Sequence, residues 1–303
     1  MIVRSERKSP RRALALLAVM VAAAGLTACS SNDDGKPAAT EIVYVTAGAS
    51  SSTPAASSAP VPTQKGAAGL RTSYAALAKT LGQPVGVSIV PVGGGAPIDL
   101  GDQTAQVAWS TIKVPLAIAA QRKNGVLAAE TPAIVNSDND AAESLWSSLG
   151  TDAQAAAAVT AVLREGGDTS TTVPSVRRRG EFTIFGQTVW ALPAAATFAA
   201  HLPCLPDSKH VVTLMGQVAG NQQWGIEVIP GRSTAVKGGW GPSLDGGYVV
   251  RQLGLLTRKD GTQVAFALST HAPGASMNSG IAALNQVGTW IGAHLAAMPG
   301  GRC

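Results

Sequence analysis

The sequence contains few of the residues that build metal sites, and little net charge. It has 3 cysteines and 4 histidines in 303 residues, and no two of them have the spacing of a zinc site. The formal net charge is +5, but five cations and one acid precede residue 13, which leaves about +1 for the rest of the chain. We therefore expect no metal, no cofactor and no nucleic-acid partner.

An apolar run long enough to cross a membrane is also missing. The run that follows the basic N-terminus covers only about a dozen residues, which is typical of a secretion signal. It ends in Leu26-Thr27-Ala28-Cys29, which resembles the lipobox of bacterial lipoproteins, where the cysteine thiol is lipidated after cleavage. We expect residues 1–28 to be the signal peptide and Cys29 to hold the protein on the extracytoplasmic side of the cell membrane. An ordinary signal peptide with a chance cysteine is the alternative.

Residues 29–67 are rich in Ser, Ala, Pro and Thr, a composition that buries too little apolar surface to fold. We expect this segment to be a disordered tether. Residues 68–303 then form one domain, which we expect to be monomeric. Its two cysteines, Cys204 and Cys303, are an even pair in an oxidising compartment, which favours a disulfide over two free thiols.

Apolar spacing and glycine stops predict the elements of this domain. Helices are expected over 68–82, 140–150, 151–167, 191–202, 208–218 and 278–297. Strands are expected over 84–92, 96–102, 233–240, 246–257 and 262–270, the last two joined by a hairpin at 258–261. The pattern predicts an α+β fold: one five-stranded antiparallel sheet with the terminal helices on one face and an all-helical lobe on the other.

Ser110 and Lys113 are three residues apart in a segment that reads as a helix, so both side chains lie on one face. A lysine beside a hydroxyl acts as its general base when burial lowers the lysine pKa. The pattern by itself has little weight, because Ser5 and Lys8 repeat it in the signal peptide. A serine N-cap with a solvated lysine is the structural alternative.

Two further motifs follow. Ser137-Asp138-Asn139 begins a helix, where these residue types are also common caps. Lys237-Gly238-Gly239 ends a strand, where glycines let a substrate backbone approach. A strand that simply ends at a glycine turn is the alternative.

The order Ser-x-x-Lys, Ser-Asp-Asn and Lys-x-Gly resembles that of the penicillin-recognising serine hydrolases, which include class A β-lactamases and DD-peptidases. The resemblance covers the whole domain, and it assigns roles. Ser110 is the nucleophile, Lys113 its base, and Ser137 and Lys237 the proton relay. Residues implied to bind substrate are Asn139, Gly239 and Trp240, with the backbone N–H groups of Ser110 and Trp240 as the oxyanion hole.

Three departures from the family pattern limit what the resemblance implies. Gly238 stands where the family usually carries a hydroxyl that binds the substrate carboxylate. Arg251 on the next strand is a candidate replacement, although strand alternation could equally direct it to solvent. No Glu-x-x-Leu-Asn motif occurs, and Glu181 in the irregular stretch 168–190 lies late for a water-activating base. The first two motifs are also closer together in the sequence than in class A enzymes, so we expect a helical lobe with fewer residues.

Two functions remain open. The first is a lipoprotein with acyl-serine chemistry on a cell-wall peptide, an ester or a β-lactam, with poor β-lactam turnover. The second is a catalytically silent lipoprotein that uses the same fold to bind an envelope ligand or partner. Retention of Ser110, Lys113 and Lys237 favours the first, while Gly238 favours the second.

Overall fold

The computed structural model describes residues 64–303, so the predicted signal peptide, Cys29 and nearly all of the predicted tether lie outside it. Its main sheet has five strands in the order β2-β1-β7-β6-β5, and every pair is antiparallel. The strands are β1 (Val85–Pro91), β2 (Ile98–Gly101), β5 (Ser233–Pro242), β6 (Gly247–Thr257) and β7 (Gln263–Pro273). The predicted α+β fold with a five-stranded antiparallel sheet is confirmed.

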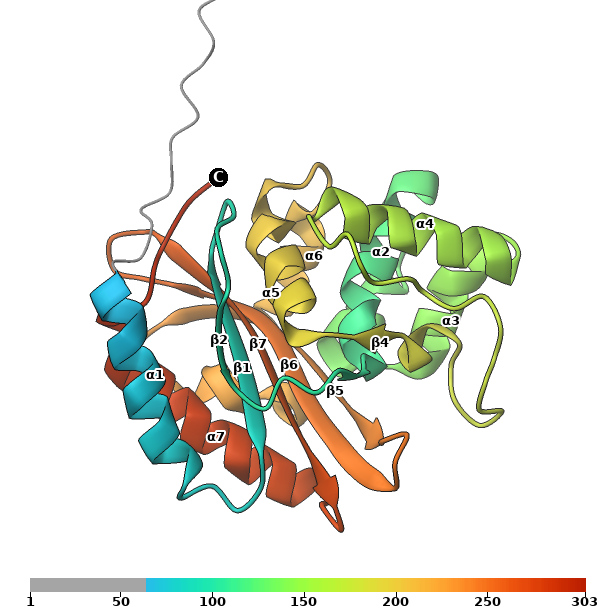
Figure 1. Cartoon of the computed structure of the whole chain (residues 1–303). Coiled ribbons are helices and arrows are strands. Elements are labelled where there is room, and N and C mark those ends of the chain that lie inside the picture. The colour runs from blue at the N-terminus through green and yellow to red at the C-terminus, as the bar shows by residue number, and fades with distance from the viewer. Residues whose placement is uncertain (1–63) are drawn as a thin grey trace, which may run out of the picture. The chain divides into compact units, whose positions relative to one another are not determined.

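Two helices cover one face of the sheet, α1 (Gln64–Ala78) and α7 (Met277–His294), and they lie against each other (Figure 1). The core between them and the sheet contains Tyr74 and Trp290, whose rings meet edge to face with centroids 5.1 Å apart. Capping explains where α7 begins, because the Ser276 side chain accepts from the Ser279 N–H in a capping box. The first and last helices of the domain thus form one layer.

The other face carries the helical lobe (Figure 1). Helix α5 (Leu192–His201) packs on the sheet, and four helices lie beyond it: α2 (Lys113–Asn124), α3 (Asn139–Ser148), α4 (Asp152–Glu165) and α6 (Lys209–Met215). A second sheet, β3 (Gln106–Val107) with β4 (Val189–Trp190), joins the two halves. Short helical turns are η1 (Trp109–Ile112), η2 (Pro132–Asn136), η3 (Phe185–Gln187), η4 (Leu202–Cys204), η5 (Gly220–Gln222), η6 (Gly225–Val228) and η7 (Leu295–Ala297).

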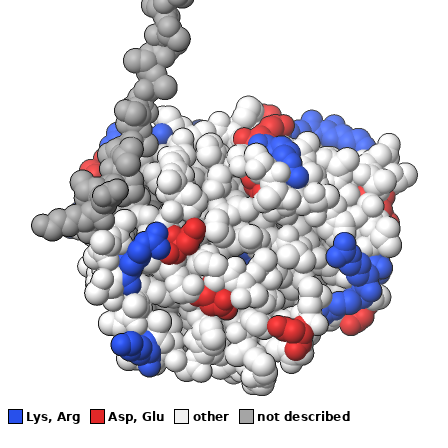
Figure 2. Space-filling model, viewed as in Figure 1, with Lys and Arg blue, Asp and Glu red and all other residues white. Residues whose placement is uncertain are grey.

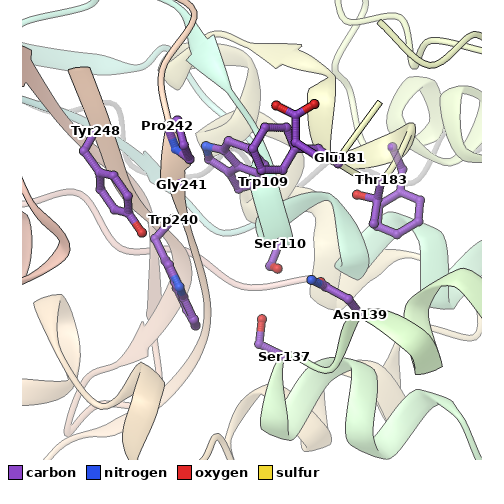
Figure 3. A pocket seen from close by; sticks show the side chains of 12 residues that line it. Trp109, Ser110, Ser137, Asn139, Glu181, Thr183, Trp240, Gly241, Pro242 and Tyr248 are labelled. Atoms are coloured by element: carbon purple, nitrogen blue, oxygen red, sulfur yellow. The ribbon is translucent and has the colours of Figure 1, made fainter. Parts of the chain in front are cut away.

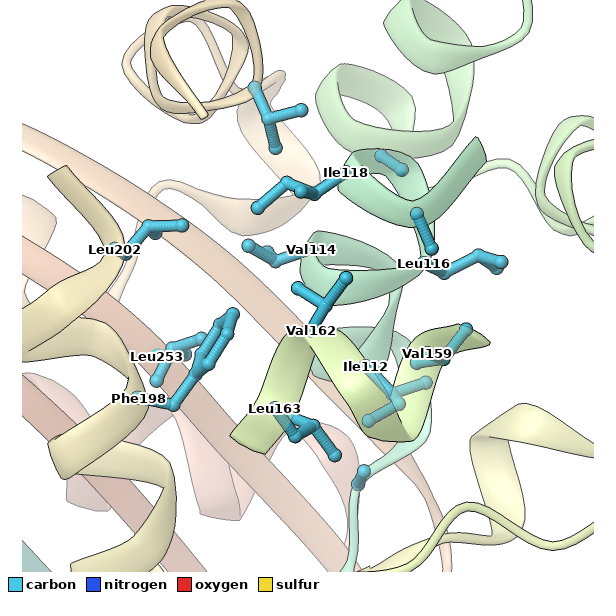
Figure 4. Close-up of a cluster of buried hydrophobic side chains, with 14 of the residues drawn as sticks. Ile112, Val114, Leu116, Ile118, Val159, Val162, Leu163, Phe198, Leu202 and Leu253 are labelled. Atoms are coloured by element: carbon cyan, nitrogen blue, oxygen red, sulfur yellow. The ribbon is translucent and has the colours of Figure 1, made fainter. Parts of the chain in front are cut away.

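Helix α2 is the centre of the lobe. Its residues from Lys113 to Ala120 are all buried, so it has no solvated face over its first two turns. Figure 4 shows Val114 and Ile118 of α2 among side chains from α4, α5 and β6, including Val162, Phe198 and Leu253. A helix buried in this way is held rigidly, because each side chain that moves must displace its neighbours.

The predicted disulfide is present: Cys204 and Cys303 are bonded, with Cα atoms 5.3 Å apart. The end of the chain is also held by a backbone pair between Gly301 and Gln263 of β7. On the face seen in Figure 2, charged side chains lie singly or in small mixed groups among uncharged residues. Within residues 64–303, we find no helix with the length and apolarity to span a membrane.

Candidate active site

Ser110 lies in the turn η1, immediately before α2, and Lys113 is the first residue of that helix. The preceding residue, Trp109, has a φ of 47°, which is rare for a side chain of this size and aims the turn into the space between lobe and sheet. The Ser110 side chain caps no helix, and Lys113 is only 1% exposed. The two structural alternatives, a serine cap and a solvated lysine, are therefore wrong.

Lys113 reaches the second motif. Its Nζ donates to the carbonyl oxygens of Ser137 (2.7 Å) and Asp138 (3.1 Å) and to Oδ1 of Asn139 (2.8 Å). The three residues of the motif have separate tasks. Asp138 is the cap of α3, accepting from the Ala141 N–H at 2.7 Å, while Asn139 turns toward Lys113. Ser137 has a φ of 60°, a left-handed conformation that directs its hydroxyl into the site.

Lys237 of β5 completes the cluster from the sheet side. It is fully buried, and its Nζ donates to Ser137 Oγ at 2.9 Å and to the Gly238 carbonyl at 2.9 Å. A third acceptor is Oε1 of Gln222, which also accepts from the Gly238 N–H at 3.0 Å. The Gln222 amide group donates to the carbonyls of Ile134 and Val135 at 3.0 and 2.9 Å. Gln222 thus links strand β5 to the turn that carries Ser137.

Burial changes the proton affinity of both lysines. Desolvation lowers the pKa of Lys113 to about 7, opposed by the negative charges of Asp138 and Glu143. Desolvation also holds the pKa of Lys237 well below its ordinary value, and the positive charge of Lys113 adds to the effect. A lysine with a pKa near 7 is neutral in a large fraction of molecules at neutral pH, which a general base requires.

Ser110, Ser137 and Asn139 line a cleft of about 290 Å³, and the two lysines lie buried behind it. Figure 3 shows the side chains of Ser110, Ser137 and Asn139 directed toward one another, with Trp240 and Tyr248 on the sheet side. The remaining lining residues are mostly aromatic or small: Trp109, Glu181, Phe182, Thr183, Phe185, Gly241 and Pro242. The arrangement is concave, with aromatic walls and several convergent polar groups, as is found in small-molecule sites.

Strand β5 passes directly beside the Ser110 backbone. A Cβ added at Gly239 would lie 2.8 Å from the Ala108 carbonyl oxygen and 3.0 Å from the Ser110 nitrogen, so only glycine fits there. Gly239 is therefore a close-approach residue, and the following Trp240 is a wall of the cleft. The oxyanion hole formed by the N–H groups of Ser110 and Trp240 stays a prediction.

Gly238 is fixed by a packing constraint that the sequence does not reveal. A Cβ at this position would lie 2.7 Å from Cζ2 of Trp224 and 3.4 Å from Cζ3 of Trp240. The Trp224 ring is buried, and its Nε1 donates to the Asn221 carbonyl at 2.9 Å. The space in which a side chain at 238 would lie is occupied by indole.

Arg251 does not bind in the cleft, and the expectation that it replaces the missing carboxylate anchor is wrong. It is 2% exposed, and one of its terminal nitrogens donates to the carbonyls of Gln106 (2.9 Å), Val107 (3.2 Å) and Trp190 (3.1 Å). Burial lowers the pKa of this guanidinium to about 10. Arg251 joins β6 to the small β3–β4 sheet and has a structural role.

Glu181, from the irregular stretch 168–190, does reach the cleft wall. In Figure 3 its carboxylate points away from Ser110, with the Trp109 ring beside it. Arg179 of the same stretch lies over the Phe182 ring, 4.2 Å from the centroid, and donates to the Pro242 carbonyl at 3.2 Å. The stretch is thus a wall that closes one end of the cleft against β5.

Sequence reasoning missed Gln222, Trp224 and the aromatic lining. Gln222 and Trp224 lie in a segment without helix or strand periodicity, so no pattern marked them as buried. Two signals were available: aromatic residues make up only 4% of the chain, and Gly238 in the middle of a strand indicates close packing. In the described part of the chain, no three His, Cys, Asp or Glu side chains gather as metal ligands would.

No protein-family model and no curated protein matches the sequence. Solved structures do. TLA-1 extended-spectrum β-lactamase has a TM-score of 0.63 and 13% identity, over 76% of this chain and 99% of that one. A β-lactamase from Burkholderia vietnamiensis has a TM-score of 0.59 and 21% identity, over 75% of this chain and 96% of that one. PBP-A has a TM-score of 0.62 and 17% identity, over 80% of this chain and 100% of that one. The resemblance read from the three motifs is confirmed at the level of fold, and the described domain has the architecture shared by class A β-lactamases and PBP-like proteins.

Proposed function

We propose that this protein is an acyl-serine hydrolase or transferase with Ser110 as its nucleophile. The observation that carries the proposal is Lys113, a buried lysine with a pKa lowered to about 7, one turn from a serine that opens onto a cleft. Ser137 and Lys237, linked at 2.9 Å, lie on the other side of the same site. Purely structural roles leave this convergence of four residues from three elements unexplained.

The proposed reaction begins when Ser110 Oγ attacks the substrate carbonyl carbon and its proton moves to neutral Lys113 Nζ. The carbonyl oxygen becomes an oxyanion held by the N–H groups of Ser110 and Trp240. The C–N or C–O bond then breaks, and the leaving group takes a proton from Ser137 Oγ, which Lys237 Nζ replaces. Water or an acceptor amine then attacks the acyl-serine and gives its proton through Ser137 to the now neutral Lys237. Lys113 returns its proton to Ser110 Oγ, the bond between Ser110 Oγ and the acyl carbon breaks, and the product is released.

The substrate is a peptide, an ester or a β-lactam, the compounds on which proteins of this fold act. We expect poor β-lactam turnover for two reasons. Gly238 has no hydroxyl to bind a carboxylate, and the Glu181 carboxylate points away from Ser110 in Figure 3. The acyl-enzyme should therefore form faster than it is released.

Intact-protein mass spectrometry tests the nucleophile. The domain, incubated with a fluorophosphonate and separately with a β-lactam, should gain the mass of the probe at Ser110. Ser110→Ala should gain nothing, while Ser208→Ala, whose hydroxyl lies in the helical lobe, should label like the parent. If no probe labels the parent chain, the acyl-serine proposal fails.

The second candidate, a silent binding domain, has its own supporting observation. Each lysine already donates to three protein acceptors, the geometry of a protonated ammonium that takes no proton from a serine. This function predicts ligand binding without any covalent adduct. The labelling experiment therefore separates the two functions.

We also propose that the protein is a monomeric lipoprotein on the extracytoplasmic face of the cell membrane, anchored through Cys29. The proposal is supported by the Leu26-Thr27-Ala28-Cys29 sequence after a short apolar run. Expressed in a bacterial host, Cys29→Ser should move the protein from the membrane fraction to the soluble extracytoplasmic fraction. Retention of that variant in membranes would refute the lipid anchor.

A further inference from the structure

The cleft around Ser110 offers no positive charge to a substrate. Among its lining residues none is Lys, Arg or His, and the one charged side chain is the carboxylate of Glu181. Five of the lining residues are aromatic: Trp109, Phe182, Phe185, Trp240 and Tyr248. A carboxylate entering this space meets π faces, one like charge and neutral hydroxyl and amide donors, and the lining supplies no opposite charge to offset the hydration that the carboxylate loses.

The cations buried near the cleft have their donors occupied. Lys113 and Lys237 each donate to three protein acceptors. Arg251 donates to three backbone carbonyls of the small β3–β4 sheet. A substrate anion gains a hydrogen bond from any of them only if a protein acceptor loses one.

Arg179 lies beside the aromatic residues Trp109 and Phe182 of the cleft, and its guanidinium already has partners within the protein. Its guanidinium lies over the rings of Phe182 (4.2 Å) and Trp109 (5.4 Å). It also donates to the Pro242 carbonyl at 3.2 Å. These contacts hold the wall to β5, and Arg179 is not among the residues that line the cleft.

The strand next to Lys237 presents an apolar surface. The Trp224 ring fills the position of a side chain at 238, and its centroid is 6.5 Å from that of Trp240 in an edge-to-face pair. Trp240 is half-buried and faces the cleft in Figure 3. A substrate group that lies along this part of β5 therefore contacts the Trp240 ring, which the buried Trp224 supports from behind.

We propose, on the basis of the acyl-serine function above, that the site takes an uncharged ester or amide. An apolar or aromatic group of the substrate lies against Trp240, and a carboxylate close to the scissile bond is rejected. Specificity of this kind arises because a polar group left without partners in the site costs more than an apolar contact gains. The substrate class is thus neutral acyl compounds and not acyl peptides that end in a free carboxylate.

Matched probe pairs that differ in one charge test this inference. The first pair is benzylpenicillin and its methyl ester. The second is 4-carboxyphenyl phenylacetate and 4-carbamoylphenyl phenylacetate, which are almost equal in size. The rate of acylation of Ser110 is followed by intact mass with the full domain. We expect the neutral member of a pair to react at least tenfold faster. Equal rates, or a faster carboxylate member, would overturn the inference.

Variants locate the cause of the preference. Gly238→Thr combined with Trp224→Ala removes the indole and supplies a hydroxyl, and it should bring the ratio of the two rates toward one. Trp224→Phe keeps an aromatic ring and should keep the preference. For Arg179→Gln we expect the ratio of the two rates to stay that of the parent. A selective loss of rate for the charged member would show that Arg179 binds the carboxylate, and it would contradict the inference.

Failure of the acylation proposal gives a different result. If a fluorophosphonate does not label Ser110, the acyl-serine function itself is wrong. If it does label Ser110, the ester pair decides the substrate class, whether or not either penicillin reacts. The comparison within the parent protein needs no variant to fold.

Discussion

Lys113 is the residue on which reactivity depends, because its burial and its hydrogen bonds act in opposite directions. Burial lowers its pKa to about 7, so its neutral form is present at neutral pH. Its three acceptors, Ser137 O, Asp138 O and Asn139 Oδ1, favour the ammonium. When Lys113 loses a proton, one acceptor loses its donor, and the lone pair becomes available to Ser110.

This balance predicts the pH dependence of labelling. The neutral fraction of Lys113 grows as pH rises through about 7, so the rate of fluorophosphonate reaction at Ser110 should rise through that pH and then level off. Lys113→Met should lower the rate about 100- to 10,000-fold and remove the step. Lys123→Met, on the exposed side of α2, is the matched control and should keep both rate and profile. A parent profile without a step would argue against Lys113 as the base.

Gln222 is the second decisive residue, and its prediction concerns stability. Gln222→Leu removes the hydrogen bonds that the Ile134 carbonyl, the Gly238 N–H and Lys237 make to Gln222 in a buried region, while the Val135 carbonyl still accepts from the Ala219 N–H. We expect the free energy of unfolding to fall by about 2–3 kcal/mol in urea titrations. The neighbouring Gln223→Leu, at an exposed position, should change it by less than about 0.5 kcal/mol. Equal effects of the two substitutions would show that the link to Lys237 adds no stability.

The site could be predicted from the sequence only where a motif carried it. Ser110, Lys113, Ser137, Asn139 and Lys237 converge as the motif order indicates. The role of Asp138 as a helix cap was one of the alternatives, and it proved true for that residue alone. Gln222 and Trp224 escaped because their burial depends on long-range packing and not on any local pattern.

Among the elements, strand β6 shows how the lobe and the sheet are joined. Arg251 reaches from β6 to the carbonyls of Gln106, Val107 and Trp190, which belong to the small β3–β4 sheet. Residue Val107 is followed within three positions by Ser110, so this contact supports the start of the turn that carries the nucleophile. Strand alternation left the face on which Arg251 lies open between the cleft and solvent, and no local pattern indicated the carbonyls that Arg251 contacts.

We therefore expect Arg251→Met to act on stability and not on substrate charge. Three buried carbonyls lose their charged donor, which should lower the free energy of unfolding by about 3 kcal/mol. The ratio of rates for charged and neutral probes should stay that of the parent. Arg71→Met, at an exposed position on α1, serves as the control and should leave stability nearly unchanged. A selective loss of reactivity toward carboxylate probes in Arg251→Met would restore the anchor role rejected above.

At the scale of the whole molecule, the disulfide ties the C-terminus to the helical lobe. Cys204 and Cys303 are 99 residues apart, and the segment between them includes β5, β6, β7 and α7. Closing so long a loop restricts the unfolded chain strongly. Cysteine parity was enough to predict the bond, because only two cysteines remain after Cys29.

Replacing both cysteines by serine should lower the free energy of unfolding by about 3 kcal/mol. Chemical denaturation with and without dithiothreitol measures the effect. The reductant should destabilise the parent by a similar amount and leave the double variant unchanged. If reduced and oxidised parent unfold at the same denaturant concentration, the bond does not support the fold.

The fold as a whole was predictable because its signals are local. The β-rich, mainly apolar runs of β1, β6 and β7, the turn at 258–261 and the glycine stops of α3 and α4 each indicate their element independently. Short hairpins then allow only antiparallel pairing between neighbours. The wall built by residues 168–190 was not predictable, since its course depends on contacts such as Arg179 with Pro242.

The contact between Gly238 and Trp224 has an evolutionary consequence. A single codon change at 238 places its new side chain against a buried, hydrogen-bonded indole, and a change at Trp224 alone opens a hole without adding a hydroxyl. Each of the two substitutions is therefore expected to lower the stability of the protein when it occurs without the other. In this background, a hydroxyl at position 238 therefore requires two coordinated substitutions, whereas other residues of the cleft can change one at a time.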